Sequence, residues 1–410
     1  MWCLDVRVLF TPLGELGHVN PLVGICQRLV RDGHRVGVHC RRNFAAQLAR
    51  AGVDAEWFGE VTEGGEMTPQ RLAARMRDPR WLKHWYGHAL ATTEPEISAI
   101  EATVRAFRPD VMAVDPLNAA AAIVAERVRL PWAALSTNFA AARPADWNCP
   151  FLEVGGRAVE SLHDLAATRG VALRLAGTDA VSPWFNTLFT TEVFAPRPAA
   201  NDYSHYVGPA RVEGTRGDEP PFPWERLDDR PLIYVASGAG QSLAFDAEQL
   251  RHIARGVDPD AVTMVIAAQS LVDDAAFRAA VPPRIIVTGY APQRRLLERA
   301  AAAVIHGGVN SVNECLDVGC PMLVLPLGKE QPLQAELARR AGVGVALDPI
   351  AMTDDDCRAA LRRLLEHDAH RNAARAIRDS YRATDSTSLV CAGLEALAAG
   401  RRPDSPVQGA

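Results

Sequence analysis

The sequence predicts an α/β fold built from two doubly wound parallel-sheet domains that face each other across a cleft. Two series of short, continuous apolar runs alternate with helical patterns, and this alternation is typical of βαβ units and parallel strands. Between the two series, residues 212–230 are rich in Gly, Pro, Asp and Glu and lack apolar periodicity, as expected of an exposed interdomain linker. Folds of this kind bind ligands at the carboxyl ends of their strands, so the site is expected between the two domains.

The first series of strands defines an N-terminal domain over residues 1–211. Its first run, residues 6–11 (VRVLFT), ends in Pro12 and a glycine-bearing loop, and a helical pattern follows over about residues 18–32. Further strands are predicted at residues 35–40, 110–115 and 130–136. An Ala-rich helical pattern separates the last two of these strands, which again indicates a βαβ unit.

The second series defines a C-terminal domain over residues 231–384. Its strands are predicted at residues 232–236, 262–267, 285–288, 302–305 and 322–325, with helical patterns between them. Helical patterns continue to the end of the chain. We expect residues 385–400 to form a helix that packs back on the N-terminal domain, and residues 401–410 to be a mobile tail.

Composition and charge exclude several classes of partner. The 410 residues carry a formal net charge of -5, so the chain offers no basic surface of the kind that neutralises nucleic-acid phosphates. The eight cysteines include no C-x-x-C pair and no metal-ligand spacing, and no secretory signal opens the chain, which predicts free thiols and a cytoplasmic protein. No apolar run approaches the ~18 residues that a membrane span needs. The oligomeric state, monomer or homodimer, is left open.

A strand-to-helix turn in the second domain has the features of an anion site. The strand ends at residue 305, the triplet His306-Gly307-Gly308 follows, and a helix is expected to begin near Asn310 or Ser311. The free backbone N–H groups and positive dipole end of such a helix attract a phosphate, and the two glycines let the backbone approach it closely. The triplet alone is equally compatible with an ordinary turn capped by a serine.

The longer segment over residues 302–331 resembles the donor-binding signature of the secondary-metabolite glycosyltransferases with the GT-B fold, both bacterial and plant. The matching residues are His306, Gly307, Gly308, Asn310, Ser311, Glu314, Gly319, Pro321, Pro326, Glu330 and Gln331. The resemblance implies a nucleoside diphosphate sugar, UDP- or dTDP-linked, as donor. It also implies that His306 contacts the diphosphate, and that Asn310 and Ser311 hold it at the start of the helix.

The same resemblance assigns the sugar contacts of the donor. Glu314 is expected to accept hydrogen bonds from the pentose hydroxyls, and Glu330 and Gln331 to bind the hexose hydroxyls. A carboxylate and an amide suit these roles because they accept hydrogen bonds from hydroxyl groups.

Upstream, residues 289–293 (GYAPQ) resemble the family segment that holds the nucleobase. Tyr290 is expected to stack on the base where plant members usually have tryptophan, and Ala291 and Gln293 lie in the part whose backbone groups read the base edge. The alternative is a tyrosine that merely packs beneath a loop.

The end of the first C-domain strand departs from the family pattern. The family commonly has Gly-Ser or Gly-Thr near the phosphates, whereas Ala239 stands at the hydroxyl position here. Ser237, Gln241 and Ser242 are the candidates to replace the missing hydroxyl, and Gly238 permits a backbone contact.

The N-terminal domain supplies a candidate base. Residues 17–21 (GHVNP) resemble the Gly-His-x-x-Pro element that carries the catalytic histidine in this family, and a base is needed to take the proton of an acceptor hydroxyl. His18 is expected at the start of a helix, where the helix dipole disfavours the imidazolium and keeps the ring neutral. Asp115, at the end of a strand, corresponds to the dyad aspartate that orients the ring. The alternative for Asp115 is a turn aspartate before Pro116.

The remaining polar clusters in the sequence do not indicate a metal site. His84 and His88 lie one turn apart on a helical stretch, where solvent or packing roles are expected, and residues 354–356 (DDD) precede a helical pattern and are expected to cap it. We therefore expect no metal and no cofactor beyond the donor. The implied mechanism is a single in-line displacement that inverts the anomeric carbon.

Aromatic residues suggest where an acceptor binds. None of the eight tryptophans lies in the C-terminal domain. The resemblance implies that the N-terminal domain forms the acceptor pocket, and the aromatic residues expected to line it are Trp81, Trp85, Trp147, Trp184 and Phe185. For each residue alone, core packing is the alternative.

The resemblance implies a hexosyltransferase of natural-product, for example antibiotic, biosynthesis. The enzyme is expected to move a hexose or deoxyhexose from a UDP- or dTDP-sugar to a hydroxyl of a small apolar aglycone of the aromatic or macrocyclic polyketide type. A lipid or carotenoid acceptor is the nearest alternative, and a GT-B sugar-nucleotide epimerase or a non-catalytic auxiliary protein is more remote. The identities of acceptor, sugar and base, and transfer to oxygen or carbon, are not readable from the sequence.

Overall fold

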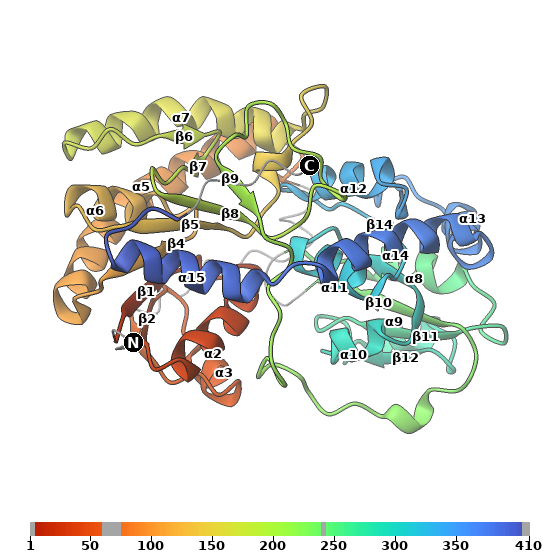
Figure 1. Cartoon of the computed structure of the whole chain (residues 1–410). Coiled ribbons are helices and arrows are strands. Elements are labelled where there is room, and N and C mark those ends of the chain that lie inside the picture. The colour runs from red at the N-terminus through yellow and green to blue at the C-terminus, as the bar shows by residue number, and fades with distance from the viewer. Residues whose placement is uncertain (1–4, 60–74, 239–242, 404–410) are drawn as a thin grey trace.

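The computed structural model describes residues 5–59, 75–238 and 243–403, which form two α/β halves side by side (Figure 1). Each half contains a parallel sheet with helices packed on it, so the predicted class of two doubly wound domains is confirmed. The predicted tail from residue 404 onward and the candidates Gln241 and Ser242 lie outside the described residues.

The N-terminal half contains a seven-stranded parallel sheet with the order β3-β2-β1-β4-β5-β8-β9. Its strands are β1 (Arg7–Thr11), β2 (Arg35–His39), β3 (Ala55–Phe58), β4 (Val111–Val114), β5 (Trp132–Ser136), β8 (Phe185–Leu188) and β9 (Ser204–Tyr206). Val8 pairs with Val36 on one side and with Val111 on the other. The strand order reverses between β1 and β4, and their carboxyl ends therefore flank the switch point where such sheets bind ligands.

Helices cover both faces of this sheet. These helices are α1 (Leu16–Val19), α2 (Val23–Arg31), α3 (Ala45–Arg50), α5 (Pro79–Phe107), α6 (Ala119–Arg127) and α7 (Pro150–Thr168). The same half contains the 3-10 turns η1 (Asn20–Leu22) and η2 (Ala140–Ala142). It also contains a small antiparallel hairpin of β6 (Leu175–Ala176) and β7 (Asp179–Ala180). The helical pattern predicted over about residues 18–32 is confirmed in extent, but it is divided into α1, η1 and α2. Pro21 has no backbone N–H to donate, and the chain passes through η1 before α2 begins.

The C-terminal half contains a six-stranded parallel sheet with the order β12-β11-β10-β13-β14-β15. Its strands are β10 (Leu232–Ala236), β11 (Thr263–Ala267), β12 (Ile286–Thr288), β13 (Ala300–Ile305), β14 (Met322–Val324) and β15 (Gly344–Ala346). Its helices are α8 (Ala247–Arg255), α9 (Ala275–Ala280), α10 (Gln293–Leu297), α11 (Val309–Val318), α12 (Gln331–Arg340), α13 (Asp354–Glu366) and α14 (Asp368–Arg382). Thr353 caps α13, with the three aspartates in its first turn.

The last helix, α15 (Ser386–Ala398), leaves the C-terminal half and lies along the N-terminal half (Figure 1). It packs against α2, and Val390, Leu394 and Leu397 join the apolar cluster of the N-terminal sheet. Gly393 makes this approach possible, because a Cβ there would lie 2.4 Å from the ring of Phe185.

The segment between the halves is closely packed at several points. A Cβ on Gly24 of α2 would lie 1.9 Å from the carbonyl oxygen of Arg211, so the chain runs directly over that helix. Arg216 is 6% exposed and Gly217 and Phe222 are also buried. The prediction that residues 212–230 form an exposed linker is therefore wrong at these positions, because composition does not reveal what a loop packs against.

Candidate active site

His18 and Asp115 lie in hydrogen-bond contact at the carboxyl end of the N-terminal sheet. His18 Nδ1 is 2.6 Å from Asp115 Oδ2. Asp115 directly follows β4, and the backbone N–H of Leu117 donates to its Oδ1 at 3.0 Å. The side chain of His18 is 15% exposed and that of Asp115 is 1% exposed. The carboxylate is therefore buried beneath an imidazole that still reaches solvent.

Thr137 is a third member of this cluster that sequence reasoning missed. Its hydroxyl donates to Asp115 Oδ2 at 3.1 Å and lies 2.7 Å from His18 Nδ1. Thr137 directly follows β5, which pairs with β4, and this neighbouring strand end was the available signal. With Nδ1 held against the carboxylate, Nε2 is the ring nitrogen left to accept a proton.

Two opposing effects set the pKa of His18. Burial lowers the pKa, but the carboxylates of Asp115 and Glu15 raise it by more, so it lies above the ordinary value for histidine. The expectation that a helix N-terminus keeps this ring neutral is wrong. His18 is the third residue of the four-residue helix α1, and carboxylates rather than helix amides dominate its surroundings.

Two contacts join the C-terminal half to the segment around His18. Lys329 Nζ is 2.9 Å from Glu15 Oε1, and this ammonium lowers the pKa of Glu15 to about 2. The side-chain amide of Asn310 donates to the carbonyl of Gly17 at 3.1 Å. These contacts place the start of α11 beside the base candidate.

The strand-to-helix turn after β13 has the predicted form. Gly307 adopts a φ of +88°, in the left-handed region that favours glycine. A Cβ on Gly308 would lie 2.7 Å from His306 Nε2, so this glycine leaves room for the ring. No side chain in the described part of the chain caps α11, and its first-turn N–H groups are therefore available to an anion.

Among the residues that the structure describes, His306 Nδ1 and Ser237 Oγ are buried and have no hydrogen-bond partner. The two residues follow adjacent strands, because Ala236 pairs with Ile305. Burial lowers the pKa of His306 to about 4, so the ring is neutral near pH 7. Gly238, which follows Ser237, has a φ of +118°. Unsatisfied polar groups are uncommon in folded proteins, and here two of them follow the carboxyl ends of the adjacent strands β10 and β13.

The residues assigned to the nucleoside form a connected network. Gln293 Nε2 donates to Glu314 Oε2 at 2.8 Å, and the hydroxyl of Tyr290 donates to Asp218 Oδ2 at 2.7 Å. Arg216 donates through Nη1 to Glu314 Oε1 and through Nε to Asp218 Oδ1. Arg216 and Asp218 gave no signal in the sequence, since they belong to the segment interpreted as linker.

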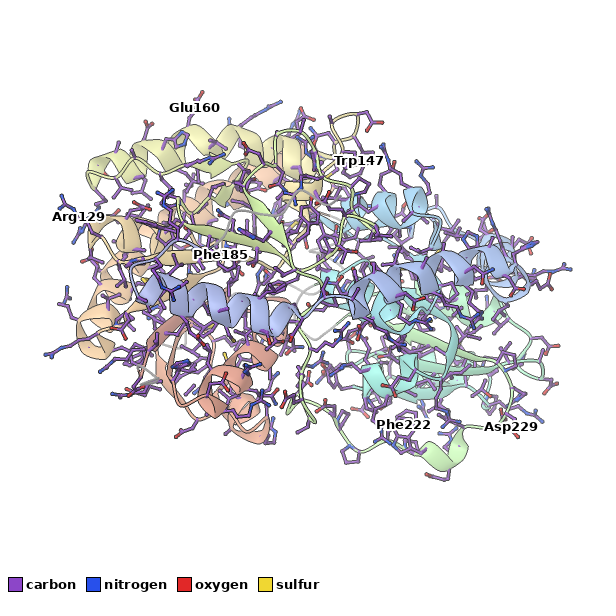
Figure 2. All side chains as sticks on the ribbon, in the orientation of Figure 1. Arg129, Trp147, Glu160, Phe185, Phe222 and Asp229 are labelled. Carbon is purple, nitrogen blue, oxygen red and sulfur yellow. The ribbon has the colours of Figure 1, made fainter. Side chains whose placement is uncertain are left out.

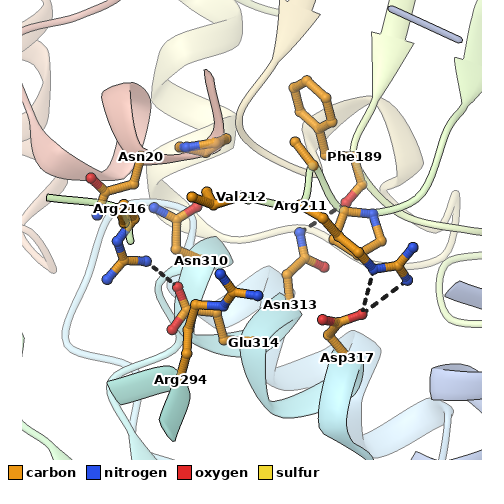
Figure 3. Close-up of a pocket in the computed structure, with 13 residues that line it drawn as sticks. Asn20, Phe189, Arg211, Val212, Arg216, Arg294, Asn310, Asn313, Glu314 and Asp317 are labelled. Atoms are coloured by element: carbon orange, nitrogen blue, oxygen red, sulfur yellow. Dashed lines mark hydrogen bonds and ion pairs between the residues drawn. The ribbon is translucent and has the colours of Figure 1, made fainter. Parts of the chain in front are cut away.

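A pocket opens beside this network, between η1, the linker and the polar face of α11 (Figure 3). Its lining residues include Asn20, Arg211, Arg216, Arg294, Asn310, Asn313, Glu314 and Asp317. The ion pair between Arg216 and Glu314 crosses one side of the pocket, and the pair between Arg211 and Asp317 crosses the other (Figure 3).

Other donor-site candidates have local partners. Gln331 is 5% exposed, and its Oε1 accepts hydrogen bonds from the backbone N–H groups of Leu327 at 2.8 Å and Gly328 at 3.2 Å. Its carbonyl oxygen therefore holds the loop before α12. Ser311 is 8% exposed and its Oγ lies 3.3 Å from the amide nitrogen of Gln293. Ala291 is buried in the short loop between β12 and α10.

Glu330 and Asp179 place acidic groups near the candidate base. Glu330, just before α12, acts on the pKa of Asp179, which burial raises to about 7 with further contributions from Asp115 and Glu330. The amide of Asn138 donates to Asp179 Oδ2 at 3.2 Å. Asp179 lies on the short strand β7, and nothing in the sequence pattern singled it out.

The predicted acceptor residues divide into two groups. Trp81 and Trp85 lie on α5 and pack on one apolar cluster with Tyr86 and Phe151; the ring centroids of Trp85 and Phe151 are 5.8 Å apart. Trp147 lies on the loop before α7, close to the C-terminal half (Figure 2).

Trp184 and Phe185 do not belong to this pocket, and their prediction is wrong. Phe185 is the first residue of β8, at the amino edge of the sheet, and packs inside the N-terminal half (Figure 2). Trp184 is 40% exposed with the guanidinium of Arg402 over its ring. The count of tryptophans per domain does not show at which end of a strand each one lies.

Within residues 5–59, 75–238 and 243–403, no group of three or more His, Cys, Asp or Glu side chains is placed to hold a metal ion. Over the same ranges, every helix is too short or too polar to cross a bilayer.

Comparison with known proteins supports the donor motif. Residues 247–397 match the family described as Erythromycin biosynthesis protein CIII-like, C-terminal domain. The chain is 26% identical to a 3-alpha-mycarosylerythronolide B desosaminyl transferase of Saccharopolyspora erythraea, over 97% of this chain and 99% of the relative.

Solved structures share the fold. The calicheamicin glycosyltransferase CalG4 is 22% identical, with a TM-score of 0.73 over 97% of this chain and 99% of the other. The spinosyn rhamnosyltransferase SpnG, complexed with thymidine diphosphate, is 19% identical, with a TM-score of 0.70 over 94% and 98%. The family match of residues 247–397, the full-length likeness to named transferases and the shared fold together identify the chain as a hexosyltransferase with the GT-B fold.

Proposed function

We propose that this protein transfers a hexose or deoxyhexose from a UDP- or dTDP-sugar to a hydroxyl of a small apolar natural product, with His18 as general base. The cluster of His18, Asp115 and Thr137 carries this proposal. It fixes Nδ1 and leaves Nε2 as a proton acceptor. The contact from Asn310 to Gly17 puts this ring beside the start of α11, where a diphosphate would bind.

In the proposed reaction the acceptor hydroxyl gives its proton to His18 Nε2 while its oxygen forms a bond to the anomeric carbon. The bond from that carbon to the diphosphate oxygen breaks, and the diphosphate leaves with the electron pair. Attack from the face opposite the leaving group inverts the configuration. Asp115 stabilises the imidazolium that forms, and the raised pKa of His18 makes it a stronger base.

The leaving group would be stabilised without a metal. The uncapped N–H groups of α11 and the neutral ring of His306 supply hydrogen-bond donors for the developing negative charge. We therefore expect full activity after treatment with a chelator.

The similar proteins favour a dTDP-linked deoxyhexose among the proposed sugar donors. The similar proteins include a desosaminyl transferase and a rhamnosyltransferase, the latter complexed with thymidine diphosphate. Desosamine and rhamnose are both deoxyhexoses, so a dTDP-deoxyhexose is the first donor to test.

The acceptor is assigned to the aromatic face of α5 and the neighbouring loop. Trp81 and Trp85 stand one turn apart, and Tyr86 and Phe151 complete an apolar surface. Trp147 packs on a separate apolar cluster that also includes residues of the C-terminal half. Aromatic walls of this kind suit an apolar aglycone of the aromatic or macrocyclic type.

The test is incubation of the purified protein with UDP- and dTDP-sugars and with aromatic and macrocyclic acceptors, followed by mass spectrometry. Wild type is expected to give an adduct of one sugar, with or without chelator. His18→Ala is expected to lose at least about 100-fold in rate, as general-base removal does. An adduct formed at the wild-type rate by His18→Ala would remove this residue from the mechanism. An isomerised donor without adduct would contradict transfer.

A further inference from the structure

Both carboxylate oxygens of Glu314 already have partners from the chain itself. Oε1 accepts from the guanidinium of Arg216, and Oε2 accepts from the amide of Gln293 at 2.8 Å. The ion pair is well shielded, with side-chain exposures of 7% for Arg216 and 14% for Glu314. Because the carboxylate is largely buried with a donor on each oxygen, a pentose that binds to Glu314 must fit beside these groups or displace them.

Arg216 is held firmly in this position. Its Nε donates to Asp218 Oδ1 at 2.9 Å, and the other oxygen of Asp218 accepts from the hydroxyl of Tyr290. The intervening Gly217 has a φ of +82°, and its carbonyl accepts from Arg50 Nε of α3 at 2.7 Å. The turn that carries the guanidinium is thus anchored on the N-terminal half.

The two partners of Glu314 differ in how readily a ligand replaces them. A hydroxyl can take the place of the Gln293 amide at little cost, because one neutral donor replaces another. Removing Arg216 from its oxygen breaks a buried pair and leaves charges unpaired, which is much more costly. The carboxylate therefore has one exchangeable oxygen.

The number of pentose hydroxyls then becomes decisive. A ribose presents vicinal 2′- and 3′-hydroxyls that would engage both oxygens of a carboxylate. A 2′-deoxyribose presents only the 3′-hydroxyl and needs one oxygen.

We propose that Arg216 is a specificity-determining residue that reduces Glu314 to a site for a single hydroxyl, so that the protein selects 2′-deoxynucleotide donors. Asp218 is the positioning residue that holds Arg216 there. This inference rests on the proposed function, in which Glu314 binds the donor pentose.

The test is isothermal titration of the full-length protein with UDP, dUDP and dTDP. UDP and dUDP differ only in the 2′-hydroxyl, and dUDP and dTDP differ only in the base methyl group. Wild type is expected to bind dUDP at least roughly tenfold more tightly than UDP, as expected when an added hydroxyl meets an occupied polar site. A wild-type ratio near one would overturn the proposal, whatever the variants do.

The double variant Arg216→Met/Asp218→Asn removes one positive and one negative charge, so the local net charge is unchanged. This variant is expected to bind UDP more tightly than wild type does. The affinities of the variant for dUDP and for UDP are then expected to differ by less than about threefold. Arg211→Met is the matched control. Arg211 pairs with Asp317 one turn further along α11 at 3.1 Å, and this variant is expected to keep the wild-type ratio.

An unchanged ratio in a folded double variant, checked by circular dichroism, would also overturn the role of Arg216. Should the double variant not fold, Asp218→Asn alone is expected to lower the ratio, since it frees the guanidinium without removing it. Glu314→Gln separates this inference from the function beneath it. If Glu314→Gln binds every nucleotide as tightly as wild type, the pentose assignment itself fails.

Discussion

At His18, the surrounding carboxylates decide the chemistry of the ring. Burial alone would lower its pKa, but Asp115 and Glu15 raise it above the ordinary value of about 6.5. A base must be neutral to accept a proton, so activity is expected to rise with pH through this raised pKa. The fraction of active enzyme is therefore lower on the acidic side than for an ordinary histidine.

Asp115→Asn is expected to shift the acidic limb of the kcat/KM profile to lower pH. Without the carboxylate, burial and the remaining charges set the pKa of His18, and the sign of the change is downward. The plateau at high pH is expected to fall by a factor on the order of 100 to 10,000, because the ring loses its orientation and the imidazolium its partner. The measurement is the pH dependence of kcat/KM for both proteins, and an unmoved limb would contradict the assignment of Asp115.

The sequence identified some of these residues and missed others for a physical reason. His18 and Asp115 lie in short motifs at strand ends, so their proximity was predictable. Thr137 was not predicted. Its position after the strand next to β4 was a signal, but this position alone does not distinguish a donor to a buried carboxylate from a surface hydroxyl. Arg216 acts through an ion pair with a residue 98 positions away, which no local pattern records.

At the level of helices and strands, the linker can pack directly on α2 because the helix has a glycine, without a Cβ, at the point of contact. Gly24 lies within α2, where glycine is normally unfavourable by about 1 kcal/mol relative to alanine. Here the carbonyl of Arg211 occupies the space that a Cβ would need. The contact fixes the path of the linker that carries Arg216.

Gly24→Ala is expected to destabilise the protein by about 1–3 kcal/mol, because the clash with linker backbone outweighs the gain in helix propensity. Gly87→Ala in α5 is the matched control, since a Cβ there meets nothing within 4 Å. This control is expected to leave stability unchanged or raise it by up to about 1 kcal/mol. Thermal unfolding midpoints of the two variants check the pair, and equal effects of both substitutions would contradict the packing described.

Strands were more predictable than their connections. The buried central strands of both sheets are continuous apolar runs, and β1, β4, β10 and β13 lie where the sequence predicted them. Strands β3, β8 and β9 were not predicted. β3 and β9 are edge strands of four and three residues with partly exposed side chains, and β8 carries polar residues in its centre.

Across the whole molecule, the two halves form one continuous structure. Phe139 and Leu188 of the N-terminal half belong to the same apolar cluster as Tyr234 and Ile305 of the C-terminal sheet. α15 crosses back to the N-terminal half, and Lys329 pairs with Glu15 beside the base candidate. Contacts between the halves therefore hold the start of α11 close to His18. Composition predicted two domains, but which side chains meet between them depends on the complete fold.

The configuration of the product tests the central claim most directly. An α-linked nucleotide sugar that the protein accepts would be used as donor, and the coupling between H1 and H2 of the purified glycoside would be read by proton NMR. Direct attack assisted by His18 predicts the β-linked product. An α-linked product would contradict the single displacement, because retention requires a second inversion or front-side attack, and neither follows from a base at His18.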